Sequence, residues 1–234
     1  GKFNKQYGVY YTPREIVHYM CRQSLINYLY TGLNPEAAAN GDSYEAAKEV
    51  SISREDIEAL IYHGESVGEH EAQVISQGRE TGRYSHLLPE SIRSHAEALD
   101  EKLARIRVCD PAVGSGAFPV GMMGEIVRAR SLLATFLKKG KTLYDFKREC
   151  IENSLYGVDI DPGAVEIAKL RLWLSLVVDE DDIQNIKPLP NLDYKIVCGN
   201  SLVGFPENLS SPIEKEIEGL IHEYFNETNP TKKS

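Results

Sequence analysis

Apolar and polar positions are distributed along this chain in blocks that predict an α/β protein. Near the amino terminus, apolar residues recur at helical spacing, and Thr12 and Pro13 stand where an N-cap and a first helical residue belong. The helical spacing is kept by Ile16, Val17, Met20, Leu25, Ile26 and Leu29. Residues 32–87 are mostly polar and interrupted by glycines, with one apolar group at residues 57–62. We therefore expect an insertion of short helices and loops there.

From residue 88 onward, the pattern predicts helices and strands in alternation. The expected elements are a helix at 91–103, a strand at 106–109, helices at 117–138 and 143–152, a strand at 154–159, a helix at 162–178 and a strand at 193–198. Asp161 is expected to cap the helix that starts at Pro162, and this helix is apolar on almost every face, which predicts burial between layers. Alternating strands and helices indicate a parallel, doubly wound sheet with right-handed crossovers.

These blocks divide the chain into three segments. Residues 1–87 form an amino-terminal helical region that includes the polar insertion, and residues 88–205 form the α/β segment. Residues 206–234 form a charged tail, in which residues 211–234 predict one amphipathic helix with a fraying end.

Composition narrows the class of protein. The chain has 42% hydrophobic and 26% charged residues, and no apolar run approaches the ~20 residues that a membrane span requires, so a soluble globular protein is expected. Lys and Arg number 26 against 35 Asp and Glu, and the resulting formal charge of −9 repels a phosphate backbone unless basic residues gather on one face. The four cysteines form no C-x-x-C pair and the histidines have no metal-ligand spacing. We expect no metal site and a cytoplasmic location.

Three turns follow the carboxyl ends of the predicted strands, where parallel sheets bind their ligands. The first turn, D-P-A-V-G-S-G-A-F at residues 110–118, has two glycines that allow a ligand to approach the backbone at a helix N-terminus. Asp159 ends the second strand, where a carboxylate can accept hydrogen bonds from ribose hydroxyls, and Ile160 can pack against a base. Asn200 follows the third strand and offers a donor and an acceptor to the edge of an adenine.

Each of these signals also has a plainer structural explanation, as a chain reversal, a solvated strand-end acid or an ordinary Gly-Asn turn. The G-x-G-x-x-G fingerprint of dinucleotide sites is not met, because Pro119 occupies the third glycine position. No P-loop motif occurs, and Ser115 lacks the flanking residues of a nucleophile elbow. The sequence thus disfavours NAD binding and excludes a P-loop ATPase.

Four motifs, taken in order, resemble those of the S-adenosylmethionine-binding half of adenine-N6 DNA methyltransferases. They are G-V-Y-Y-T-P at 8–13, V-C-D-P-A-V-G-S-G-A-F at 108–118, L-Y-G-V-D-I-D-P at 155–162 and C-G-N-S-L-V-G-F at 198–205. The nearest resemblance is to the methylase region of fused restriction-modification enzymes of the Eco57I type (type IIG), followed by the methylation subunits of type I systems. The resemblance covers residues 7–31 and 88–205 well.

This resemblance implies S-adenosylmethionine as the cofactor, bound at the strand ends of a partial Rossmann-like sheet. Its methionine end would be held by Tyr10, Thr12, Asp110, Ala112, Gly114 and Gly116, and Ala117 and Phe118 are also expected among the cofactor-binding residues. Asp159 would bind the ribose hydroxyls and Ile160 would sandwich the adenine. Asn200 would bond the adenine edge, although the family often has an aspartate there, with Ser201 and Leu202 closing that wall.

The family's catalytic motif, [N/D/S]-P-P-[Y/F/W], holds the flipped adenine, and no such string occurs in this sequence. We therefore expect an amino-terminal fragment of a bacterial or archaeal parent enzyme, inactive alone, with no catalytic residue of its own. The resemblance implies that other parts of the parent bind DNA, and it includes parents fused to a type II endonuclease. The free edge of the first predicted strand could pair two fragments into a homodimer.

Two other functions stay open at this point. Related sheets with a similar catalytic motif methylate protein glutamine or RNA, although the Y-Y-T-P opening favours DNA. A non-catalytic interaction module is the third reading, in which the polar insertion at 34–84 docks a partner and the sheet is its scaffold.

Overall fold

The computed structural model describes residues 12–34, 52–77, 85–137, 140–178, 188 and 190–203. The chain divides into two compact units, Gly1–Gly199 and Asn200–Ser234, and the helices and strands described below all belong to the first. No helix among the described residues is long and apolar enough to cross a membrane.

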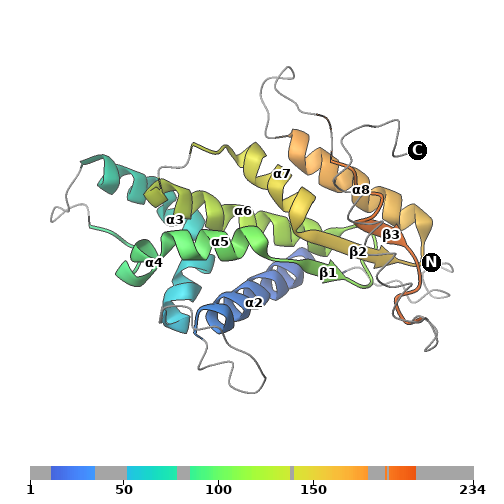
Figure 1. Ribbon diagram of the computed structural model, residues 1–234, viewed down its shortest axis with the longest axis horizontal. Helices are drawn as coiled ribbons and strands as arrows, with labels where there is room; N and C mark the ends of the chain where they lie inside the picture. The colour runs from blue at the N-terminus through green and yellow to red at the C-terminus, as the bar shows by residue number, and fades with distance from the viewer. Residues whose placement is uncertain are drawn as a thin grey trace, which may run out of the picture. The chain divides into compact units, whose positions relative to one another are not determined.

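The first unit is a mixed α/β fold whose elements follow the predicted order (Figure 1). The elements are α2 Arg14–Leu33, α3 Arg54–Gln77, α4 Glu90–Ser94, α5 Ala96–Arg105, β1 Val108–Asp110, α6 Ala117–Leu137, α7 Leu143–Asn153, β2 Leu155–Asp159, α8 Pro162–Val177 and β3 Ile196–Cys198. The predicted helix at 91–103 is interrupted at His95, which separates α4 from α5. The predicted tail helix at 211–234 lies outside the described residues.

The three strands form one parallel sheet in the order β1-β2-β3. Val108 pairs with Leu155 and Asp110 with Gly157, while Asp159 pairs with Cys198. Because all three strands are parallel, their carboxyl ends lie along one edge of the sheet. The predicted α/β class and parallel pairing are therefore confirmed, and the turns after the strands share that edge.

Helix α6 is the centre of the helical part of the fold. It contacts α2, α3, α5 and α7, and Figure 1 shows it among these helices on one side of the sheet. Its buried side chains include Met122, Met123, Ile126 and Leu133. The mostly apolar composition of residues 117–137, which predicted a long helix, thus also explains its central position.

Three sequence expectations about helices are wrong. The first concerns the insertion, where α3 is a single helix of 24 residues instead of short pieces. Its apolar residues Ile57, Leu60 and Val74 are buried, and a Cβ atom on Gly68 would lie 3.8 Å from Leu132 of α6. Packing against α2 and α6 stabilises a helix that its glycines would otherwise weaken.

The second correction concerns the start of α2. Pro13, not Thr12, is the N-cap residue, with φ −55° and ψ 147°, and its carbonyl accepts the amides of Ile16 and Val17 at 3.1 Å each. Thr12 is exposed and precedes the cap. The first hydrogen bonds of α2 are thus accepted by the backbone carbonyl of Pro13, and no side chain caps the helix.

The third correction concerns α8, which is not buried on all sides. Val165, Ala168, Leu172 and Leu176 are buried against the rest of the first unit. The opposite face carries large apolar side chains that are half-exposed or more, namely Ile167, Leu170, Leu174 and Val178. A helix that is apolar on almost every face is expected to be covered on both sides. The described residues of this chain cover α8 on one side only.

Candidate functional site

Asp110 and Asp159 end neighbouring strands and both accept hydrogen bonds from nearby backbone amides. Asp110 Oδ1 accepts the amide of Ala112 at 3.0 Å. Asp159 Oδ2 accepts the amide of Gly114 at 2.8 Å, and its Oδ1 accepts the amide of Asp161 at 2.9 Å. Asp159 thereby connects the turn after β1 to the turn after β2, so these two predicted site residues lie at one edge of the sheet.

The two glycines of the first turn have different roles. Both have positive φ, +50° for Gly114 and +86° for Gly116, a conformation that side-chain-bearing residues rarely adopt. A Cβ atom on Gly116 would lie 3.1 Å from Cα of Ala168, so Gly116 allows α6 to start close to α8. A Cβ atom on Gly114 would meet no atom within 4 Å, so the backbone at Gly114 is open to a ligand.

Val113 and Gly157 also shape this turn, and sequence reasoning did not identify them. The amide of Val113 donates to the carbonyl of Val158 at 2.9 Å, and the Val113 side chain is buried over Gly157. A Cβ atom on Gly157 would lie 2.7 Å from Val113 Cγ2. A glycine inside a buried strand is itself a signal of close approach, and it could have identified this pair.

The electrostatics of the site are set by burial and by two neighbouring carboxylates. Burial raises the pKa of Asp110, the hydrogen bond from the Ala112 amide opposes that rise, and the charge on Asp159 adds to it. A cation placed between the two carboxylates would relieve their repulsion. The strand ends therefore present negative charge and hydrogen-bond acceptors to a ligand.

The remaining predicted residues surround this pair to different degrees. Ile160 follows Asp159 and is 66% exposed, and Ala112 is also exposed. Ala117 and Phe118 are half-buried at the start of α6, where the Phe118 carbonyl accepts a hydrogen bond from Cys21 Sγ at 3.8 Å. This contact joins α2 to the start of α6.

Tyr10 lies outside the described residues. Asn200, Ser201 and Leu202 belong to the second unit, where Asn200 Oδ1 accepts the amide of Leu202 at 3.0 Å. Asp161 caps α8 as predicted, because its Oδ1 accepts the amide of Gly163 at 2.8 Å. Within the part of the chain that the structure describes, no group of three or more His, Cys, Asp or Glu side chains could hold a metal ion.

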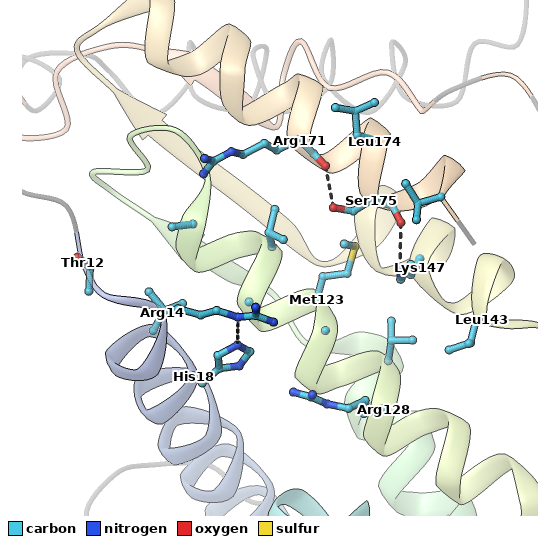
Figure 2. Close-up of a pocket in the computed structure, with 17 residues that line it drawn as sticks. Thr12, Arg14, His18, Met123, Arg128, Leu143, Lys147, Arg171, Leu174 and Ser175 are labelled. Carbon is cyan, nitrogen blue, oxygen red and sulfur yellow. Dashed lines mark hydrogen bonds between the residues drawn. The ribbon is translucent and has the colours of Figure 1, made fainter. Parts of the chain in front are cut away.

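A cavity of about 710 Å³ adjoins the first turn and was not foreseen from the sequence. Thr12 and Ala117 line one end of it, and it follows α6 between α2, α7 and α8. Figure 2 shows Arg14 and His18 on one side of the cavity, Arg171 and Ser175 on the other, and Met123 between them. This cavity is contiguous with two predicted cofactor residues but contains neither Asp110 nor Asp159 in its lining.

Comparison with known proteins identifies the family. The family model described as "MmeI, DNA-methyltransferase domain" matches residues 89–219, more than half of the chain. A protein of Methanocaldococcus jannaschii named "Putative type II restriction enzyme and methyltransferase" is 33% identical over 213 residues. That alignment covers 89% of this chain and 16% of the relative, so the chain spans about a sixth of that relative's length.

No solved structure matches the chain. The resemblance to a DNA methyltransferase, predicted from four short motifs, is confirmed by the family match, which includes the turns after β1 and β2. The chain belongs to the family of the MmeI DNA-methyltransferase domain.

Proposed function

We propose that this chain is the S-adenosylmethionine-binding part of a site-specific DNA adenine-N6 methyltransferase within a restriction-modification enzyme. The observation that carries the proposal is that Asp110 and Asp159 end adjacent parallel strands, and that Asp159 accepts the amide of Gly114 from the turn that follows Asp110. The family match and the name of the Methanocaldococcus jannaschii relative support the methyltransferase and restriction-modification parts.

The side chains of the site suit this cofactor. A carboxylate has about four acceptor positions, and the Asp159 carboxylate accepts one amide at each oxygen, so it retains capacity for two ribose hydroxyls. The exposed side chain of Ile160 offers an apolar surface to a flat adenine ring. The open backbone at Gly114 permits close approach of the chain to the ligand.

The charges of the site also suit S-adenosylmethionine. S-adenosylmethionine carries a positive sulfonium and an α-ammonium group, and it supplies an electrophilic methyl group when bound. Asp110 and Asp159 complement that positive charge, and cation binding would favour the ionised form of Asp110 against its raised pKa. The role of this chain is then to bind and orient the methyl donor at the strand ends of a partial Rossmann-like sheet.

The finer assignment to adenine N6 is supported by the order of the motifs, in which Y-Y-T-P precedes D-P-A-V-G-S-G-A-F. The formal charge of −9 supports DNA binding by other parts of the parent enzyme. A fused type II endonuclease is supported by the name of the Methanocaldococcus jannaschii relative, and its assignment to the Eco57I kind is supported by the motif resemblance.

Calorimetric titration with S-adenosylmethionine tests the proposal. We expect saturable binding that Asp159→Asn weakens about tenfold or more, since hydrogen bonds to a charged carboxylate contribute about 1.5–3 kcal/mol. Asp161→Asn is the matched control, because asparagine preserves the N-cap of α8, and it should leave the affinity within about twofold of the wild type. Absence of binding by folded protein, or equal losses in the two variants, would contradict the proposal.

A further inference from the structure

We propose that the groove between α2, α6, α7 and α8 is a docking site for an acidic amphipathic helix supplied from outside this chain. The groove is the cavity of about 710 Å³ described above. It combines an apolar floor with a basic rim, and each feature constrains the partner.

The floor is built from aliphatic side chains. Val17 of α2 and Val120, Met123 and Val127 of α6 line it, together with Leu174 of α8 and Val178, the C-cap residue of α8. Gly124 also lines it, and because a Cβ atom there would meet nothing within 4 Å, a partner backbone could approach α6 at this point. Val17, Met123 and Val127 are at most 4% exposed, so the apolar surface that a partner helix would bury is mainly that of Val120, Leu174 and Val178.

Helix α8 extends this apolar surface beyond the groove. Ile167, Leu170, Leu174 and Val178 are 49%, 51%, 53% and 77% exposed. Their spacing of three, four and four residues places them on one face of the helix. Such a stripe matches a partner helix with apolar residues at positions i, i+3, i+4 and i+7.

The rim is basic. Arg14, Arg128, Lys147 and Arg171 line the groove, and none of the lining residues among the described part of the chain is acidic. Buried Glu125 forms ion pairs with Arg22, Arg128 and, when protonated, His18. Its negative charge therefore neutralises part of the positive charge of the rim. In a chain with a formal charge of −9, a groove whose described lining residues include four cations and no acid departs from the average surface and complements acidic side chains.

The dimensions and polarity of the groove favour a protein helix over DNA as its occupant. Along α6 the groove runs from Ala117 to Arg128, which corresponds to about 16 Å or three helical turns. DNA-binding surfaces are polar and wet, so a floor of aliphatic side chains suits a protein partner better. Arg171 also donates to the Ser115 carbonyl at 3.2 Å and to its hydroxyl at 3.1 Å, so a docked helix would lie beside the candidate cofactor turn.

Synthetic peptides test this inference by fluorescence anisotropy. The probe is a labelled helical peptide of about 18 residues with leucines at i, i+3, i+4 and i+7 and glutamates on both flanks. Its comparators are the same peptide with lysine at each glutamate position and a scrambled glutamate peptide. We expect the acidic amphipathic peptide to bind about tenfold more tightly than either comparator, and equal binding of all three would overturn the inference.

Variants locate the binding. Leu174→Glu removes an apolar contact of the floor and Arg14→Glu reverses a charge of the rim, and each should weaken binding about tenfold. Leu87→Glu and Arg105→Glu are matched controls at exposed positions outside the groove, and they should leave binding within about twofold. Circular dichroism should show the same helix content in all four variants.

Two results would overturn the proposal in favour of another occupant. One is a concentration-dependent dimer that Leu174→Glu dissociates, which would assign the groove to a second copy of this chain. The other is a duplex DNA probe that binds more tightly than the acidic peptide and loses affinity in Arg14→Glu.

Discussion

The carboxylate of Asp159 accepts a hydrogen bond from the amide of Gly114 at 2.8 Å, although 45 positions separate the two residues in the sequence. The bond brings the turn after β1 to the carboxyl end of β2. It leaves the Gly114 backbone facing open space on the side where a side chain would project. This contact between two turns therefore helps to shape the candidate cofactor site, together with the hydrogen bond from the Val113 amide to the Val158 carbonyl.

Substitutions of the two turn glycines should separate backbone strain from packing. Gly114→Ala should destabilise the fold by about 1 kcal/mol, because φ +50° is unfavourable for alanine while the space is open. Gly116→Ala should cost about 2–4 kcal/mol, because φ +86° is combined with a Cβ position 3.1 Å from the Ala168 backbone. Urea denaturation measures both, and equal losses would mean that the contact with α8 is unimportant.

Gly157→Ala, a substitution in β2, should distort the turn after β1. Its Cβ would lie 2.7 Å from Val113 Cγ2, so Val113 must move, and we expect a loss of about 1–3 kcal/mol together with weaker S-adenosylmethionine binding. Gly124→Ala is the matched control in the middle of α6, where a Cβ meets nothing within 4 Å. That variant should gain about 0.5–1 kcal/mol in urea denaturation. A Gly157→Ala protein of unchanged stability and affinity would contradict the packing argument.

Asp110→Asn should increase stability at neutral pH while weakening cofactor binding. Burial raises the pKa of Asp110 in the folded protein, so its ionised form is less stable there than in the unfolded chain. Between the unfolded and the folded pKa, stability falls as pH rises, and the neutral amide removes that loss. Thermal unfolding from pH 3 to 8 should show a higher Tm for the variant only toward neutral pH, and calorimetry should show reduced affinity.

Glu71 should stabilise the fold more at neutral pH than at acidic pH, which is the opposite of the pH dependence expected for Asp110. Burial by itself would raise its pKa, but hydrogen bonds from His86 and from the amides of Leu88 and Leu87 together hold the pKa below its ordinary value. The ionised carboxylate therefore stabilises the fold above the unfolded pKa, and this contribution is lost as pH falls through the lower, folded value.

Urea denaturation between pH 7 and pH 3 measures this contribution. The wild type should lose more stability over this range than Glu71→Gln, which keeps one acceptor but has no charge to titrate. Glu58→Gln, which removes an ion pair with Arg54 that is 38–39% exposed, should follow the wild-type curve closely. Parallel curves for Glu71→Gln and the wild type would contradict the role of Glu71.

Features governed by local chemistry could be predicted from the sequence. Asp161 and Pro162 are a favourable N-cap and first residue, and α8 begins there with the expected hydrogen bond to Gly163. Apolar periodicity and turn residues similarly placed α6, α7 and β2 within one or two residues of their observed bounds. The strand-end position of Asp159 followed from the same pattern, since parallel strands present their carboxyl ends at one edge.

Features that join distant residues were decided only by the tertiary structure. Four such features depend on residues far away in the chain. They are the packing of Val113 on Gly157, the length of α3, the exposed face of α8 and the basic groove. A sequence pattern states which side chains prefer burial, but not which neighbours are present to bury them. The sequence by itself therefore determined the order of elements, the acids at the strand ends and the family resemblance, whereas close packing decided how the turns meet and where a cavity remains.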